Sequence, residues 1–115
     1  MGWFARMFSN SIEAKIERAQ HFIKNHRYND ARLELLDVDA PQARNLLKEC
    51  CKILCEMNLE HAEARFSAYE YDAAREHLEL AHQFGATESQ LREVRSQGRR
   101  FRQEQRENQE KDQKE

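Results

Sequence analysis

YNDARLEL at residues 28–35 and YDAAREHL at residues 71–78 share the pattern Tyr-x-x-Ala-Arg-x-x-Leu within a chain of 115 residues. Each copy follows a stretch with helical periodicity, and each has an alanine nine residues before its tyrosine, Ala19 and Ala62. Such a recurrence in a helical sequence predicts hairpins of helices that stack, an architecture that usually holds other molecules. The repeated pattern therefore indicates a scaffold.

The composition indicates one small all-α domain. The chain is long enough to bury a hydrophobic core without disulfides or metals. It has only 3 glycines and 1 proline, so few positions interrupt a helical pattern. The formal net charge of -2 argues against a general nucleic-acid binder.

The motifs that usually carry catalysis or metal binding do not occur in this sequence. There is no glycine-rich phosphate loop and no nucleophile elbow. Cys50, Cys51 and Cys55 lack the Cys-x-x-Cys spacing typical of zinc sites, and we interpret them as small packing residues. We therefore expect no enzyme, no metal site and no cofactor.

The chain shows no targeting or membrane-spanning pattern. Its apolar start is too short for a secretory signal, and no apolar run is long enough to cross a bilayer. With three cysteines and no secretory signal, we expect a cytoplasmic protein.

Apolar periodicity predicts six helices. The first has an N-cap in residues 9–11, Pro41 lies in the first turn of the third, and Gly85 ends the fifth. Residues 1–10 form an apolar segment, 11–106 the helical domain and 107–115 a polar disordered tail. The expected helices are 11–25, a short one after Tyr28, 40–57, a short one that carries Leu59, Ala62 and Phe66, 71–84, and one that starts near 88.

These residues resemble the tetratricopeptide repeat (TPR), a helical hairpin of about 34 residues. Small residues let its two helices approach closely. The resemblance implies three antiparallel hairpins stacked as a short TPR-like solenoid that binds a protein or peptide. The residues that match are Ala19, Phe22, Tyr28, Ala31 and Leu35 in the first hairpin, and Ala62, Tyr71, Ala74, Leu78 and Ala81 in the second.

Two departures from the repeat leave the pairing of the helices open. The copies lie 43 residues apart, and His26 stands where the repeat has its turn glycine. Tyr71 therefore begins either the second helix of one hairpin or the first helix of the next.

Two sets of residues are candidates for partner binding. Glu13, Glu17 and Gln20 share one face of the first helix, where the resemblance places the groove. The second set is an apolar cluster at helical spacing, which caps the first hairpin, docks on a partner or a second copy, or inserts shallowly into a membrane surface. The cluster comprises Trp3, Phe4, Met7 and Phe8.

A run of arginines near the C-terminus is a candidate anion site. Six arginines lie in residues 92–106, with Glu93 and Glu104 as the only acids. They bind RNA phosphates or an acidic partner, or they form a solvated helix face. The candidate anion-binding residues are Arg92, Arg95, Arg99, Arg100 and Arg102.

The leading hypothesis from the sequence is a non-enzymatic adaptor for a protein or peptide. The alternative is a peripheral subunit at a membrane or ribonucleoprotein, which would use the apolar N-terminal cluster or the arginines. The sequence does not fix the oligomeric state.

Overall fold

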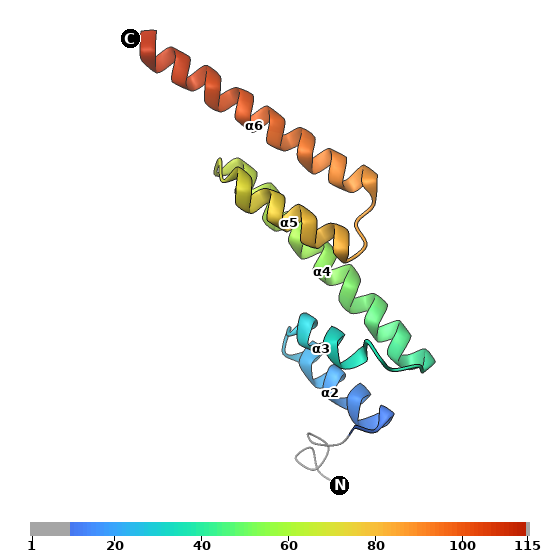
Figure 1. The fold of residues 1–115 in the computed structure, drawn as a ribbon. Helices are drawn as coiled ribbons and strands as arrows, with labels where there is room; N and C mark the ends of the chain where they lie inside the picture. The colour runs from blue at the N-terminus through green and yellow to red at the C-terminus, as the bar shows by residue number, and fades with distance from the viewer. Residues whose placement is uncertain (1–9, 115) are drawn as a thin grey trace. The chain divides into compact units, whose positions relative to one another are not determined.

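The computed structural model describes residues 10–114, which are all-α and contain no strand. This confirms the predicted fold class. None of the helices in residues 10–114 combines the length and apolar character needed to cross a membrane. The helices are α2 (Ile12–Lys24), α3 (Tyr28–Leu35), α4 (Pro41–Ser67), α5 (Tyr71–Gln83) and α6 (Glu88–Lys114) (Figure 1).

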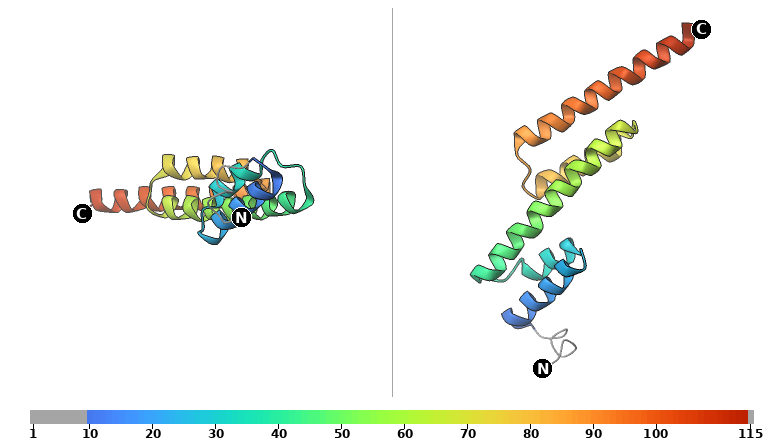
Figure 2. Two further views of the ribbon diagram at one scale, coloured as in Figure 1. Left: turned by 90° about the horizontal axis from the view of Figure 1, so that it is seen from below. Right: turned by 180° about the vertical axis from the view of Figure 1, so that it is seen from behind.

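The chain forms two compact units, Met1–Leu54 and Cys55–Glu115. In the first unit α2 and α3 make a hairpin (Figures 1 and 2). Arg18 of α2 is nearly buried and pairs with Glu34 of α3, with 3.1 Å between Nη2 and Oε2. The core of this unit comprises Ile16, Ala19, Ala31, Leu35, Val38, Ala43 and Cys50.

The second unit contains the second part of α4 together with α5 and α6. His77 of α5 faces Asn58 of α4, with 3.0 Å between Nδ1 and Oδ1. After α5 the chain turns through residues 84–87 into α6 (Figure 1), and Gly85 has a positive φ there. The core of this unit comprises Cys55, Ala62, Phe66, Ala74, Leu78, Ala81, Ala86, Leu91 and Val94.

The repeated sequence pattern follows a repeated turn. His26 and Tyr69, each two residues before a tyrosine of the pattern, have positive φ angles of 59° and 61°. The backbone N–H groups that follow them donate to Phe22 O and Arg65 O, both at 2.8 Å. These are the six-to-one hydrogen bonds of a Schellman motif, which usually needs glycine at the left-handed position. Both copies of the pattern thus follow the same type of turn, although neither has a glycine at its left-handed position.

The four alanines at which the sequence predicts close helix contact are buried, as this prediction requires. Ala19, Ala31, Ala62 and Ala74 are all 0% exposed. An alanine at such a position lets the backbones of two helices approach each other closely. In both copies the tyrosine begins the helix after the turn, so Tyr71 starts the second helix of the α4–α5 hairpin.

Two helix boundaries differ from those predicted. The expected third and fourth helices, 40–57 and the short helix after it, are one continuous α4. Asn58, at the expected break, is 9% exposed and its side chain is engaged by His77, so it neither caps nor ends a helix. Residues 107–114, expected as a disordered tail, continue α6 to Lys114 as exposed turns rich in good helix formers.

Candidate functional site

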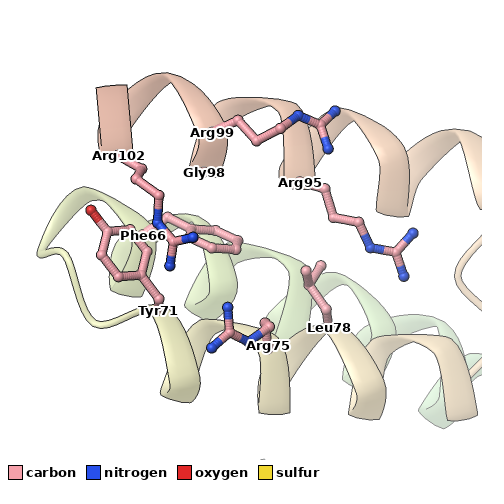
Figure 3. A pocket seen from close by; sticks show the side chains of 8 residues that line it. All are labelled: Phe66, Tyr71, Arg75, Leu78, Arg95, Gly98, Arg99 and Arg102. Atoms are coloured by element: carbon pink, nitrogen blue, oxygen red, sulfur yellow. The ribbon is translucent and has the colours of Figure 1, made fainter. Parts of the chain in front are cut away.

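The second unit contains a pocket between residues of α5 and α6, with a volume of about 170 Å³ (Figure 3). Hereafter this is the α5/α6 pocket. Arg75 reaches it from α5, and Arg95, Arg99 and Arg102 reach it from α6. The residues that line it are Phe66, Tyr71, Arg75, Leu78, Arg95, Gly98, Arg99 and Arg102.

Phe66 and Leu78 form the apolar floor of the α5/α6 pocket, and a glycine in α6 lets this helix approach Phe66 closely. A Cβ atom on Gly98 would lie 2.6 Å from two carbons of the Phe66 ring, closer than carbon atoms pack. Phe66 is 6% exposed and Leu78 is 4% exposed. Glycine inside a helix is unfavourable by roughly 0.5–1 kcal/mol relative to alanine, so Gly98 is explained by this close approach.

Tyr71 is half-buried at one side of the pocket. Both its hydroxyl group and its ring make contacts with α6. Its O–H donates to Gln105 Oε1 at 2.6 Å. The guanidinium carbon of Arg102 lies 4.4 Å from the centre of its ring, a cation–π contact (Figure 3). The Phe66 ring centre is 6.4 Å away at a tilt of 48°. The aromatic surface is therefore in place without a ligand.

The four arginines that line the pocket form its rim, and only one of them takes part in an ion pair among residues 10–114. Arg75 pairs with Asp72, and Arg99 donates to Ser96 Oγ at 3.1 Å. Among the ion pairs of residues 10–114, none includes Arg95, Arg99 or Arg102. The exposed rim is therefore ready to accept an anion.

The spacing of the arginines on α6 places like charges next to one another. Arg92, Arg95, Arg99, Arg102 and Arg106 follow intervals of three and four residues, which puts them on one helix face. Each like-charged neighbour pair at this spacing is destabilising by about 0.2–0.5 kcal/mol. An anion bound between Arg95, Arg99 and Arg102, the three that line the pocket, would reduce this repulsion.

The α5/α6 pocket has the chemistry of a binding site. Arginine binds carboxylates and phosphates with two parallel hydrogen bonds. The apolar floor can cover an apolar side chain. The lining contains no carboxylate, histidine or cysteine that could act as a general acid, general base or thiol nucleophile.

Three of the five arginines proposed from the sequence come together at this pocket. Arg95, Arg99 and Arg102 line it. Arg100 lines a separate hollow with Gln97, Phe101 and Glu104. Arg92 is exposed and is not part of either lining.

The other candidates from the sequence lie elsewhere. Glu13, Glu17 and Gln20 are on α2 in the first unit, with Glu13 and Gln20 exposed and Glu17 half-buried. The apolar N-terminal cluster of Trp3, Phe4, Met7 and Phe8 lies outside the described residues.

Sequence reasoning missed Phe66, Tyr71, Arg75, Leu78 and Gly98 as residues of one site. Four of them carried a signal. Tyr71, Arg75 and Leu78 belong to the repeated pattern, and Gly98 lies at helical spacing between Val94 and Phe101, where a lone glycine often marks a close contact. Phe66 has the ordinary pattern of a core residue.

Two of the three cysteines lie in the cores, and Cys51 is half-buried outside both. Cys50 is 0% exposed in the first unit, and Cys55 is 7% exposed in the second. Burial raises the pKa of both thiols; Cys51 and then Glu49 raise the pKa of Cys50 further, and Glu56 raises that of Cys55. No group of three or more metal-ligating side chains occurs among the described residues.

His77 in the second unit is expected to make its stability depend on pH. The rings of His61 and His77 lie 5.1 Å apart. Burial, followed by the charges of His61 and Arg65, lowers the pKa of His77 below its ordinary value. At mildly acidic pH the unfolded chain therefore binds a proton at His77 that the folded chain does not bind.

We expect the free energy of unfolding to fall as the pH is lowered through about 6.5, the ordinary pKa of histidine. His77→Gln, which keeps a side-chain amide near Asn58, should flatten this dependence. Urea unfolding followed by circular dichroism at several pH values measures it. His82→Gln, a change at an exposed histidine of the same helix, is the control and should keep the slope. An equal slope in His77→Gln and wild type would contradict the prediction.

Comparisons with known proteins give no relative for this chain. No family model, curated protein or solved structure matches it significantly. The function must therefore be argued from the geometry of the α5/α6 pocket.

Proposed function

We propose that the chain is a non-enzymatic, cytoplasmic adaptor that binds a segment of a partner protein in the α5/α6 pocket. One observation carries the proposal. Arg95, Arg99 and Arg102, which take part in no ion pair among residues 10–114, line the α6 side of a pocket whose apolar floor is already formed. Pockets with an apolar base and a few convergent polar groups are the usual places for ligands.

The repeated hairpin supports a TPR-like scaffold as the framework of this adaptor. The α2–α3 and α4–α5 hairpins share the same turn geometry before Tyr28 and Tyr71. They also share the fully buried alanines at matching positions. We propose that these hairpins are repeats of TPR type and that α6 follows the second one. Repeats of this kind usually bind proteins or peptides.

Selection from a displayed peptide library against the full chain tests the proposal. We expect enriched peptides that bind the wild type and that shift the backbone amide NMR signals of Tyr71, Gly98 and Arg99. The same peptides should bind Arg99→Glu more weakly, because this change reverses a charge on the rim without altering a buried residue. Arg92→Glu, a reversal outside the pocket on the same helix, is the matched control.

The proposal fails if the library gives no enriched peptide. It also fails if the enriched peptides bind Arg99→Glu and Arg92→Glu equally well, because the α5/α6 pocket is then not their site.

A further inference from the structure

We infer that the α5/α6 pocket is selective for an acidic segment that carries one aromatic side chain. This inference rests on the proposed function and specifies the chemistry of the ligand. Two groups of the ligand would bind: an aromatic side chain on the apolar floor, and carboxylates at the arginines of the rim.

The size and lining of the pocket suit one aromatic ring. Its volume is about 170 Å³, and an apolar protein cavity of about 150 Å³ accommodates benzene. Phe66 and Leu78 offer buried apolar walls, and Tyr71 offers a half-buried ring. Aromatic rings pack favourably with their centres about 4.5–7 Å apart. A ligand ring would meet such partners on the floor.

The rim supplies charge complementarity for carboxylates on the α6 side of the pocket. Arg95, Arg99 and Arg102 lie seven residues apart from first to last, a rise of about 10 Å along the helix. Arg75 on the α5 side already pairs with Asp72. Carboxylates that flank the aromatic residue of a ligand would therefore bind the α6 arginines, and they would also relieve the repulsion between them.

The surroundings of the pocket favour a short acidic segment over a long polyanion. A neighbouring hollow that shares Tyr71, Arg75 and Arg102 contains the carboxylates of Glu70 and Asp72. Glu70 pairs with Arg65 and Asp72 pairs with Arg75, so the α5 side offers a broad anionic surface such as a membrane no net positive charge. The net charge of -2 gives the chain no general attraction for polyanions. A short segment can place the carboxylates next to its aromatic residue on the three arginines of α6 that line the pocket.

Fluorescence anisotropy with a labelled peptide, Glu-Asp-Glu-Phe-Glu-Asp-Glu, and the full chain tests the inference. We expect binding that weakens when salt rises from about 50 to 300 mM, because exposed charges are screened. Replacement of the phenylalanine by alanine should weaken binding roughly tenfold or more, from the loss of buried apolar area. Replacement of all acids by their amides should weaken it at least as much.

Two double variants place the binding on the pocket. Arg95→Gln/Arg99→Gln should weaken binding of the acidic peptide roughly 10- to 100-fold, from the loss of charge-assisted hydrogen bonds. Arg92→Gln/Arg100→Gln removes the same charge from the same helix outside the pocket and should leave most of the affinity. All four residues are exposed, and circular dichroism confirms that both variants keep their helices.

Each other outcome overturns the inference. Equal losses in the two double variants would mean nonspecific attraction to arginines. Stronger pocket-dependent binding of poly-uridylate or of vesicles containing phosphatidylserine would assign the site to a nucleic acid or a membrane. Pocket-dependent binding of the amide peptide at full strength would remove the acidic preference and leave the adaptor proposal standing. If the acidic peptide does not bind while library peptides occupy the pocket, the ligand chemistry alone is wrong. If neither binds, the proposed function fails with it.

Discussion

Phe66→Ala is expected to lower the free energy of unfolding by about 3–5 kcal/mol, the usual cost of truncating a buried phenylalanine. Phe66 is 6% exposed, belongs to the core of the second unit and touches the one glycine inside α6. Removal of its ring leaves a cavity that rigid helices on both sides cannot fill. Because small domains are stable by only about 5–15 kcal/mol, this single change should bring the second unit close to unfolding.

Urea unfolding followed by circular dichroism at the helix band measures this loss. Leu80→Ala is the control, since Leu80 is 38% exposed on α5 and its truncation should have a much smaller effect. A loss for Phe66→Ala no larger than that for Leu80→Ala would mean that Phe66 does not hold this core together. The α5/α6 pocket would then have no fixed floor.

The sequence predicted the parts of the fold that local chemistry determines. Pro41 begins α4 as expected. Thr87 and Gln90 have the Thr-x-x-Gln spacing of a capping box and form one, in which Gln90 N–H donates to Thr87 Oγ1 at 3.1 Å and Thr87 N–H donates to Gln90 Oε1 at 2.9 Å. Gly85 adopts a φ of 103° after the end of α5. Each of these signals lies within one helix end, where a few neighbouring residues decide the structure.

The sequence did not predict features that depend on contacts between distant residues. Asn58 is a weak helix former, and its neighbours alone do not show that His77, nineteen residues later, engages its side chain within α4. The α5/α6 pocket likewise needs Phe66, Tyr71 and Gly98 from three different helices. The arginine spacing on α6 was visible in the sequence. Its apolar floor was not, because buried residues that line a pocket look like any other core residues.

Gly98→Val is expected to lower the free energy of unfolding by roughly 1–3 kcal/mol, the usual range for overpacking a core. Helix propensity alone predicts that the substitution raises the free energy of unfolding, since glycine is the poorer helix former by several tenths of a kcal/mol. The structure decides between them because a Cβ at residue 98 lies 2.6 Å from Phe66, whose buried ring has little freedom to move.

Urea unfolding of Gly98→Val and of Gln103→Val separates the two effects. Gln103 is exposed on the same helix, so its substitution reports helix propensity without the contact to Phe66. We expect Gln103→Val to change stability by only a few tenths of a kcal/mol and Gly98→Val to be clearly less stable. A Gly98→Val variant as stable as the wild type would show that α6 does not approach Phe66 closely. The aromatic floor and the arginine rim would then not belong to one pocket, and the proposed ligand would lose its site.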